Sequence, residues 1–260
     1  MPELIINKIR YPVKGILFDK DGTLLDFIRL WGRWSESMQS HYENLLPGWK
    51  IGSLPELWGT IHDDTGRIID YKRNGPLAMG STGDLLAILA LQGYRLGLPW
   101  GESMRLVRES KQLADKEMER VRPAFPLPGM IPFLKHCSDQ GLSIGIVTAD
   151  ETPEAVKHME WMGIRQYFKS IIGNDQVERG KPYPDMVEKA CMELGLVPAD
   201  VAVIGDTNSD MQMGNSAGVA VTIGILPSES GLAGECVLQD AKVTVSSYAQ
   251  LKLEETLNES

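Results

Sequence analysis

Two aspartates separated by one residue, Asp19 and Asp21 in the segment DKDGTLLD, are the strongest chemical signal in the chain. They follow the apolar run KGILF at 14–18, which is typical of a buried parallel strand that ends in a loop. Carboxylate oxygens are the hard ligands that Mg²⁺ prefers, and a carboxylate also serves as a nucleophile or as a general acid and base. An aspartate pair followed by Gly22 is equally a common turn, so this motif alone leaves a purely structural role open.

Three further elements follow the aspartate pair, each at the end of an expected strand or at the entry to a helix. They are Thr148 in VTAD, Lys181 in GKPYPD, and Asp206 with Asp210 in GDTNSD. Taken singly, each has an ordinary structural explanation, such as a β-branched strand end, a solvated lysine or an aspartate in the first turn of a helix. Their order and common placement favour a single site.

The elements that must position these residues alternate along the chain. Apolar runs predict strands at 14–18, 142–148, 170–173, 201–206 and 219–224, and the intervening stretches predict helices at 129–140, 153–162, 184–194 and 209–216. Thr152 followed by Pro153 is typical of a helix start, and Gly141, Gly163 and Gly195 are typical of helix ends. This alternation predicts a doubly wound α/β domain with a parallel sheet.

Residues 27–122 follow a different pattern and predict an inserted all-helical domain. Apolar residues recur at three- and four-residue steps from Phe27 to Leu45, as on an amphipathic helix. A second helix is expected from Ser81 or Thr82 through Leu91, stopped by Gly93, and a third at 101–120.

The core domain is therefore expected to comprise residues 1–26 and 123–260. The proline-rich segment 122–129 is expected to act as a linker, and the tail from Ser246 onward is expected to form one last helix.

The chain carries four motifs in the order DxDGT, Thr, Lys-Pro and GDxxxD. They resemble the four motifs of the haloacid dehalogenase (HAD) superfamily, and the helical insert resembles that family's C1 cap. The resemblance extends over essentially the whole chain. It implies a HAD-like Rossmannoid core and a Mg²⁺-dependent phosphatase, similar to phosphoglycolate phosphatases and β-phosphoglucomutases. Such an enzyme hydrolyses a small-molecule phosphate monoester through an aspartyl-phosphate intermediate.

The resemblance also implies the metal ligands and the two reacting carboxylates. Asp19 is the expected nucleophile, and Asp21 is expected to protonate the leaving alkoxide and then to take a proton from the attacking water. The side chains of Asp19 and Asp206 and the backbone carbonyl of Asp21 are the expected Mg²⁺ ligands. Asp210 is expected to support the metal site or to hold Lys181.

Two further motif residues are expected to bind the phosphoryl group. Thr148 offers its hydroxyl and Lys181 its positive charge, and backbone amides of Lys20, Asp21 and Ala149 are the expected additional donors. A phosphate monoester is a dianion that repels a carboxylate nucleophile, so positive charge is required where the phosphoryl group lies.

Charge considerations give expectations for the remaining residues. With an ordinary pKa near ~3.9, Asp19 is expected to be ionised at neutral pH without an activating base. Four carboxylates opposed by one Mg²⁺ and Lys181 leave one excess negative charge, which predicts that Asp21 is protonated as substrate binds. Lys20 is expected to point away from Asp19 with a structural role, and Asp150 is expected to cap the helix that follows it.

Composition limits the other classes of function. The 260 residues have a formal charge of -9 and a pI near 5.0, which argues against a nucleic-acid partner. Three cysteines without CxxC spacing and four scattered histidines indicate neither a disulfide framework nor a zinc site. No signal peptide or long apolar span is evident, so a cytoplasmic protein without membrane contact is expected. The expected partner is a small phosphorylated metabolite; monomer and homodimer both remain open.

Several alternatives stay open. A phosphomutase would use the same phosphoaspartate but return the phosphoryl group to a sugar. A haloacid dehalogenase is disfavoured because that branch lacks the second aspartate. A phospho-acceptor signalling domain also combines Asp, Thr and Lys on a doubly wound sheet, but the large insert and the DxDGT spacing argue against it. A non-catalytic binding protein would have little need of all four motifs.

Overall fold

The computed structural model describes residues 2–226 and 238–254 and divides the chain into two compact units. Unit 1 comprises Met1–Asp26 and Pro126–Ser260, and unit 2 comprises Phe27–Phe125. The chain thus returns to the first unit after Phe125, whereas the sequence pattern placed this return after residue 122. None of the helices in the described ranges is both long and apolar enough to cross a membrane.

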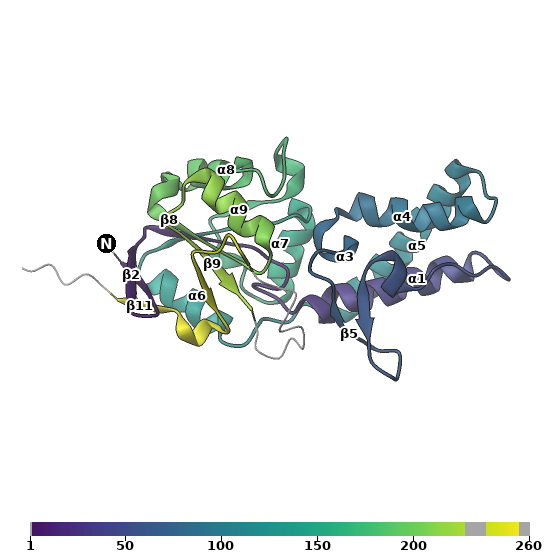
Figure 1. The fold of residues 1–260 in the computed structure, drawn as a ribbon, viewed down its shortest axis with the longest axis horizontal. Coiled ribbons are helices and arrows are strands. Elements are labelled where there is room, and N and C mark those ends of the chain that lie inside the picture. The colour runs from purple at the N-terminus through teal and green to yellow at the C-terminus, as the bar shows by residue number, and fades with distance from the viewer. Residues whose placement is uncertain (1, 227–237, 255–260) are drawn as a thin grey trace, which may run out of the picture. The chain divides into compact units, whose positions relative to one another are not determined.

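Unit 1 is built on a six-stranded sheet whose neighbouring strands are all parallel, in the order β10-β9-β8-β3-β6-β7 (Figure 1). The strands are β3 (Gly15–Phe18), β6 (Ser143–Val147), β7 (Ser170–Ile172), β8 (Val201–Gly205), β9 (Val221–Ile225) and β10 (Val243–Val245). Every residue of β3, β8 and β9 is buried. This burial on both faces explains why the strands appear in the sequence as continuous apolar runs.

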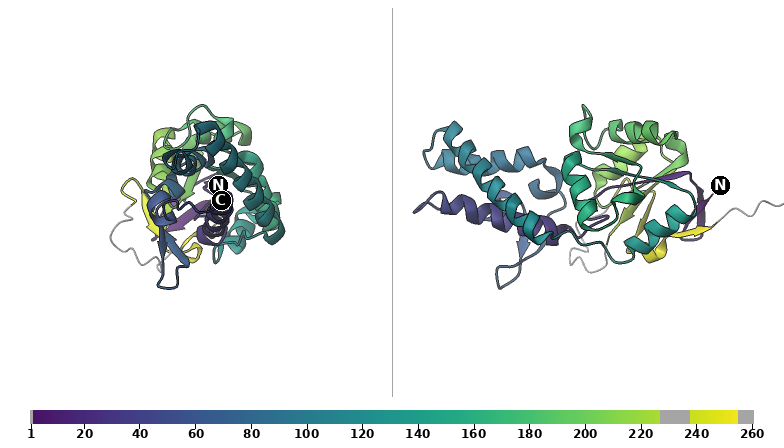
Figure 2. Two further views of the ribbon diagram at one scale, coloured as in Figure 1. Left: turned by 90° about the vertical axis from the view of Figure 1, so that its right-hand side faces the viewer. Right: turned by 180° about the vertical axis from the view of Figure 1, so that it is seen from behind.

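Helices cover both faces of this sheet. They are α6 (Met130–Asp139), α7 (Thr152–Trp161), α8 (Asp185–Leu194) and α9 (Asn208–Ala217). In Figures 1 and 2, α8 and α9 lie on one face and α6 lies on the other. Leu17 and Val203 of the sheet pack with Met186 of α8 in a fully buried cluster. The predicted doubly wound α/β fold is confirmed.

A small antiparallel sheet at the chain ends corrects the expectation for the tail. It has the order β11-β1-β2, with β1 (Glu3–Ile6), β2 (Ile9–Pro12) and β11 (Lys252–Glu254). Residues 246–254 do not form the helix expected from Ser246 onward, because the 3-10 turn Tyr248–Gln250 and then β11 stand there. The rest of that expected helix, residues 255–260, lies outside the described residues. Leu251 and Leu253 are buried while Lys252 between them is exposed, which is the two-residue period of a strand.

Unit 2 is mainly helical, but the expectation of an all-helical insert is wrong in one respect. Its helices are the π-helical turn η1 (Ile28–Gly32), α1 (Arg33–Asn44), α2 (Leu54–Leu57), α3 (Pro76–Met79), α4 (Thr82–Arg95) and α5 (Trp100–Val121). The strands β4 (Thr60–His62) and β5 (Ile68–Tyr71) also pair in an antiparallel hairpin. Strands this short give no recognisable apolar run.

Helix α4 also continues past the glycine that was expected to stop it. Gly93 lies inside the helix, and a Cβ atom there would overlap the side-chain oxygens of Tyr42 and Ser103. The glycine therefore serves the close packing of α4 on α1 and α5. The predicted start is confirmed, since Ser81 is the N-cap and accepts a hydrogen bond from the amide of Asp84.

Candidate active site

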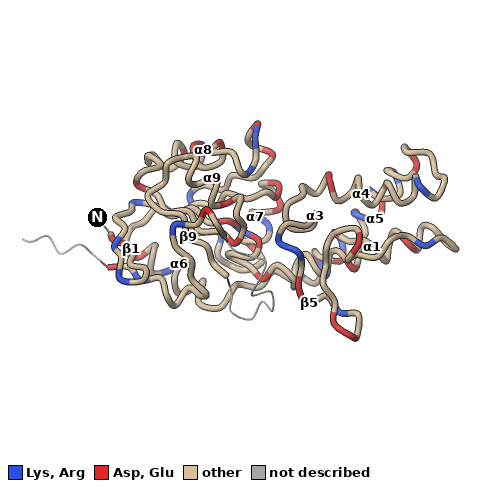
Figure 3. The backbone as a smooth tube through the Cα atoms, in the orientation of Figure 1, with Lys and Arg blue, Asp and Glu red and all other residues tan. Residues whose placement is uncertain are grey.

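The predicted site residues of unit 1 gather at the carboxyl-terminal edge of the parallel sheet. Asp19 follows β3, Thr148 follows β6 and Asp206 follows β8, and β3 lies between the other two strands. The amide of Asp19 donates to the carbonyl of Ile204 at 2.8 Å, which extends the sheet to the site. Figure 3 shows acidic positions beside α7 in this region. The edge where parallel strands end is the usual ligand site of such folds.

Three buried carboxylates form the centre of the site. One carboxylate oxygen from each of Asp19, Asp206 and Asp210 lies within 4.8 Å of the other two, and the three residues are at most 5% exposed. Gly22 allows this packing: it has a φ of 82°, and a Cβ atom there would overlap the Asp206 carboxylate. Buried like charges at such separations favour a bound cation.

Lys181 supplies a positive charge beside these carboxylates. Its Nζ lies 2.5 Å from Oδ1 of Asp19 and 2.6 Å from Oδ1 of Asp210, and its side chain is 8% exposed. Burial alone would lower the pKa of Lys181, but the charges of the two carboxylates outweigh burial and raise that pKa above its ordinary value. The ammonium therefore stays charged.

Of the two roles that the sequence left open for Asp210, the structure shows the contact with Lys181. Asp210 is the third residue of α9, and its Oδ2 accepts hydrogen bonds from the amide and hydroxyl of Thr207 at 3.0 and 2.6 Å. Its other oxygen contacts Lys181. Asp210 is fully buried, which excludes the alternative of an exposed aspartate that only favours the helix dipole. The structure thus favours a supporting residue that holds Lys181.

The pKa of Asp19 differs from the ordinary value of an aspartate. Burial raises the pKa of Asp19 to about 7, Lys181 opposes this rise, and the nearby charges of Asp210 and Asp21 add to it. The expectation from the ordinary pKa leaves this burial out. That Asp19 is ionised in the complete site stays a prediction.

Thr148 directly follows β6 at the same edge of the sheet as Asp19. It is almost fully buried, and its Oγ1 accepts a hydrogen bond from the amide of Asp150 at 3.2 Å. Accepting this bond leaves the hydroxyl hydrogen able to donate elsewhere. The expected use of the backbone amides and of the Asp21 carbonyl stays a prediction.

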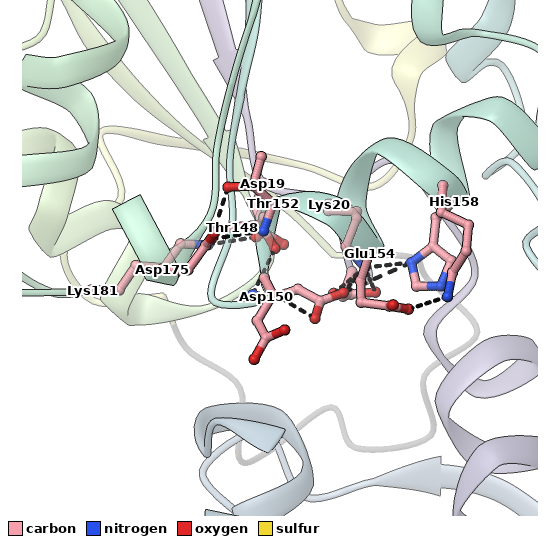
Figure 4. A network of polar contacts seen from close by, with 12 residues as sticks. Asp19, Lys20, Thr148, Asp150, Thr152, Glu154, His158, Asp175 and Lys181 are labelled. Carbon is pink, nitrogen blue, oxygen red and sulfur yellow. Dashed lines mark hydrogen bonds and ion pairs between the residues drawn. The ribbon is translucent and has the colours of Figure 1, made fainter. Parts of the chain in front are cut away.

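A second buried charge cluster, which the sequence did not predict, adjoins the site. The Nζ of Lys20 lies 2.6 Å from Oδ2 of Asp21, 3.2 Å from Oδ2 of Asp150 and 3.3 Å from Nδ1 of His158. Lys20 is fully buried. In Figure 4 its side chain runs toward His158 and away from Lys181, in the direction that strand alternation predicts.

The remaining members of this cluster have strongly shifted pKa values. Burial lowers the pKa of His158 to about 2, with further lowering by the charges of Lys20 and Lys157, so the imidazole is neutral. A neutral ring lets Nδ1 accept a hydrogen bond from Lys20. Burial raises the pKa of Asp150 to about 6, and the charge of Lys20 opposes that rise.

Asp150 only partly fills its expected capping role. Its Oδ1 accepts a hydrogen bond from the amide of Glu151 at 2.8 Å, but the amide of Thr152 donates to Asp175 at 2.7 Å. The other oxygen of Asp150 pairs with Lys20. Because Lys20 and Asp150 add one charge of each sign, the predicted excess of one negative charge in the site is unchanged.

The cluster around Lys20 was missed because two of its partners, Asp150 and His158, are distant in sequence. Lys20 is separated from His158 by 138 positions, and no spacing rule connects them. The position of Lys20 in the sequence is the signal that could have predicted this charge cluster. A lysine directly after a fully buried strand and between two aspartates requires a paired ammonium if it is buried.

Comparisons with known proteins place these features in a family. The haloacid dehalogenase-like hydrolase family matches residues 13–218. A phosphoglycolate phosphatase of Salmonella typhi is 32% identical over 215 residues, covering 82% of this chain and 81% of that protein.

Two solved structures share the fold. One is a predicted phosphoglycolate phosphatase from Haemophilus somnus 129pt, with a TM-score of 0.63 at 18% identity, covering 82% of this chain and 85% of that one. The other is a putative β-phosphoglucomutase from Thermotoga maritima, with a TM-score of 0.60 at 20% identity, covering 89% and 94%.

The chain belongs to the haloacid dehalogenase-like hydrolase family. The resemblance noted in the sequence is confirmed, and so is the expectation of a HAD-type phosphatase enzyme. The buried acidic cluster of Asp19, Asp206 and Asp210 can bind a metal ion, as enzymes of this family generally do.

Proposed function

We propose that this protein is a Mg²⁺-dependent phosphatase that hydrolyses a small phosphate monoester through a phosphoryl group carried on Asp19. The proposal rests on one juxtaposition: three buried carboxylates lie together, and the Lys181 ammonium contacts two of them. This arrangement offers a nucleophile, a cation site and a fixed positive charge for a dianionic phosphate.

The donor set fits Mg²⁺. Asp19 and Asp206 would hold the ion with hard carboxylate oxygens, with Asp210 next to them. When bound, the ion supplies positive charge to the phosphoryl oxygens and favours the ionised form of Asp19. The second effect matters because burial and the neighbouring charges together raise the pKa of Asp19 to about 7.

The chain's own residues would then carry out two displacements. In the first, a carboxylate oxygen of Asp19 attacks phosphorus, the bond to the ester oxygen breaks, and Asp21 gives its proton to the leaving alkoxide. In the second, Asp21 takes a proton from water, whose oxygen attacks phosphorus and displaces Asp19. Lys181 and the Thr148 hydroxyl hold the phosphoryl oxygens during both displacements.

The relatives favour a small acid phosphate as substrate. The phosphoglycolate phosphatase of Salmonella typhi matches most of this chain, so 2-phosphoglycolate is the first compound to test. We also propose a cytoplasmic location, because Cys137 and Cys191 are buried free thiols. Cys236 lies outside the described residues.

Phosphate release from a panel of esters, with and without Mg²⁺, tests the proposal. The panel contains 2-phosphoglycolate, other small acid phosphates and hexose phosphates, and isomerisation of the hexose phosphates is followed separately. We expect Mg²⁺-dependent release that Asp19→Asn abolishes. The control is Asp200→Asn, which removes an ion-paired aspartate next to β8 at the opposite end of the sheet. Isomerisation without free phosphate would identify a phosphomutase instead, and equal rates in the Asp19→Asn protein would overturn the proposal.

A further inference from the structure

We propose that Lys20 is a positioning residue that holds the Asp21 carboxylate in the place from which it acts as general acid. This inference rests on the proposed function, since it concerns the residue that protonates the leaving group. Lys20 does not itself reach the substrate, because its side chain is fully buried, whereas the Asp21 side chain is 16% exposed.

Lys20 fixes Asp21 through both its backbone and its side chain. Its carbonyl accepts hydrogen bonds from the amides of Leu24 at 2.9 Å and Leu25 at 3.1 Å, which closes the loop that contains Asp21. Its ammonium lies 2.7 Å from Oδ1 and 2.6 Å from Oδ2 of Asp21. Both oxygens of the carboxylate are therefore oriented by one cation. A charge-assisted contact of this length is among the stronger polar contacts in proteins.

The ammonium is held in turn by groups from other elements. Asp150, in the loop after β6, lies 3.2 Å away, and Nδ1 of His158 on α7 lies 3.3 Å away. The ammonium of a lysine stands at the end of a flexible side chain, so it holds another group in place only if its own position is fixed. The contacts with Asp150 and His158 fix the ammonium of Lys20. In Figure 4, Lys20 lies between the labelled residues Asp150 and His158. The direction of Asp21 thus depends on Asp150 and His158, which hold Lys20.

The charge balance explains why a lysine is tolerated in this position. A buried ammonium requires carboxylate partners, and Asp21 and Asp150 together provide them. The cluster retains one negative charge, and neutral His158 contributes a hydrogen-bond acceptor without adding a second positive charge.

The test uses the chemistry of a general acid. An acid is needed to expel an alkoxide but not to expel p-nitrophenolate, which leaves readily without a proton. We therefore compare kcat/KM for an alkyl phosphate and for p-nitrophenyl phosphate in the wild type and in Lys20→Met, because kcat/KM reports the step in which the leaving group departs. General acid catalysis contributes about 10²- to 10⁴-fold. A misplaced acid loses a part of this, and we expect at least about a tenfold loss for the alkyl ester with less than about a threefold loss for the nitrophenyl ester.

Three further variants separate positioning from damage to the fold. Lys20→Met combined with Asp150→Asn removes one buried charge of each sign, and it should show the same leaving-group dependence. Lys14→Met is the matched control, because it removes a lysine that is ion-paired to Asp200 at 2.6 Å just before the same strand. We expect Lys14→Met to leave both esters unchanged. Lys20→Arg, which keeps the charge, should recover part of the loss for the alkyl ester.

The outcomes also distinguish this inference from the proposed function. If the wild type hydrolyses both esters and Lys20→Met slows them by the same factor, the positioning role is overturned while the phosphatase stands. If the wild type hydrolyses neither ester nor any other phosphate, the proposed function has failed. A crystal structure of Lys20→Met then tests the geometry by itself. A displaced Asp21 carboxylate in this variant would support the positioning role of Lys20, and a carboxylate in its original place would overturn that role.

Discussion

Replacement of the buried His158 by asparagine should make the protein resist acid better than the wild type does. His158 is 4% exposed and neutral, with a pKa lowered by burial to about 2 from the ordinary 6.5. The unfolded chain binds a proton at this imidazole below about pH 6.5, and the folded chain does not. Acid therefore favours the unfolded state, so the stability associated with neutral His158 is lost as pH falls through the unfolded pKa. Asparagine can accept the hydrogen bond from Lys20 but does not titrate.

The size of the effect follows from these two pKa values. One proton of difference between the states changes the free energy of unfolding by about 1.4 kcal/mol per pH unit. Between about pH 7.5 and about pH 4.5 the linkage amounts to about 3 kcal/mol, because the unfolded imidazole is almost fully protonated at the lower pH and the folded one is not. Asp19 and Asp150 titrate in the same range with raised pKa values, and their effect on stability has the opposite sign. Both residues are present in both proteins, so their contributions largely cancel in the difference.

Urea denaturation at a series of pH values measures this difference. We expect the difference in free energy of unfolding, His158→Asn minus wild type, to increase by about 3 kcal/mol as the pH is lowered over this range. The exposed His136→Asn controls for the loss of an imidazole, and its difference from the wild type should stay within about 0.5 kcal/mol. A His158 difference that does not change with pH would refute the neutral, buried state. A change of opposite sign would indicate a protonated His158 stabilised by Asp150.

Three further predictions concern the site itself. Lys181→Met should lower kcat/KM for a phosphate ester about 10²- to 10³-fold, because it removes the fixed charge beside Asp19, and an unchanged value would contradict the role given to Lys181. Gly22→Ala should destabilise the protein more than Gly66→Ala in urea denaturation. Both glycines have φ near 82°, but only at Gly22 would a Cβ atom meet the Asp206 carboxylate; equal costs would contradict this packing. Mg²⁺ at about one hundred times its Kd should stabilise the wild type by about 3 kcal/mol in thermal denaturation. The Asp206→Asn protein should lose most of this stabilisation. An equal stabilisation of both proteins would exclude Asp206 as a ligand.

The sequence predicted the strand ends that carry Asp19 and Asp206, because strand ends have local signals. Asp19 and Asp206 each follow a fully buried apolar run, and such runs are recognisable without any knowledge of the fold. In a parallel sheet the ends of neighbouring strands meet at one edge, so the predicted strands already place these residues together. Lys181 could be assigned only from the family resemblance, because no local pattern indicates that its ammonium lies beside Asp19.

The rest depends on contacts that no local pattern contains. Lys20 is buried against His158, which belongs to a helix far along the chain, and the pKa of Asp19 depends on burial in the folded protein. The hairpin of β4 and β5 and the strand β11 are too short to outweigh neighbouring helical or turn signals. Gly93 was taken as a helix stop because the sequence does not show that a helix packs against it.

Trapping of the covalent intermediate tests the central claim most directly. The Asp21→Asn protein lacks the group that takes a proton from water, so it should accumulate the phosphoryl enzyme when given a substrate such as p-nitrophenyl phosphate, which needs no acid to leave. Acid quench followed by peptide mass spectrometry should then find one phosphoryl group on Asp19, and none in the protein that also carries Asp19→Asn. A phosphoryl group on another residue, or none on Asp19 during demonstrable turnover, would contradict the account.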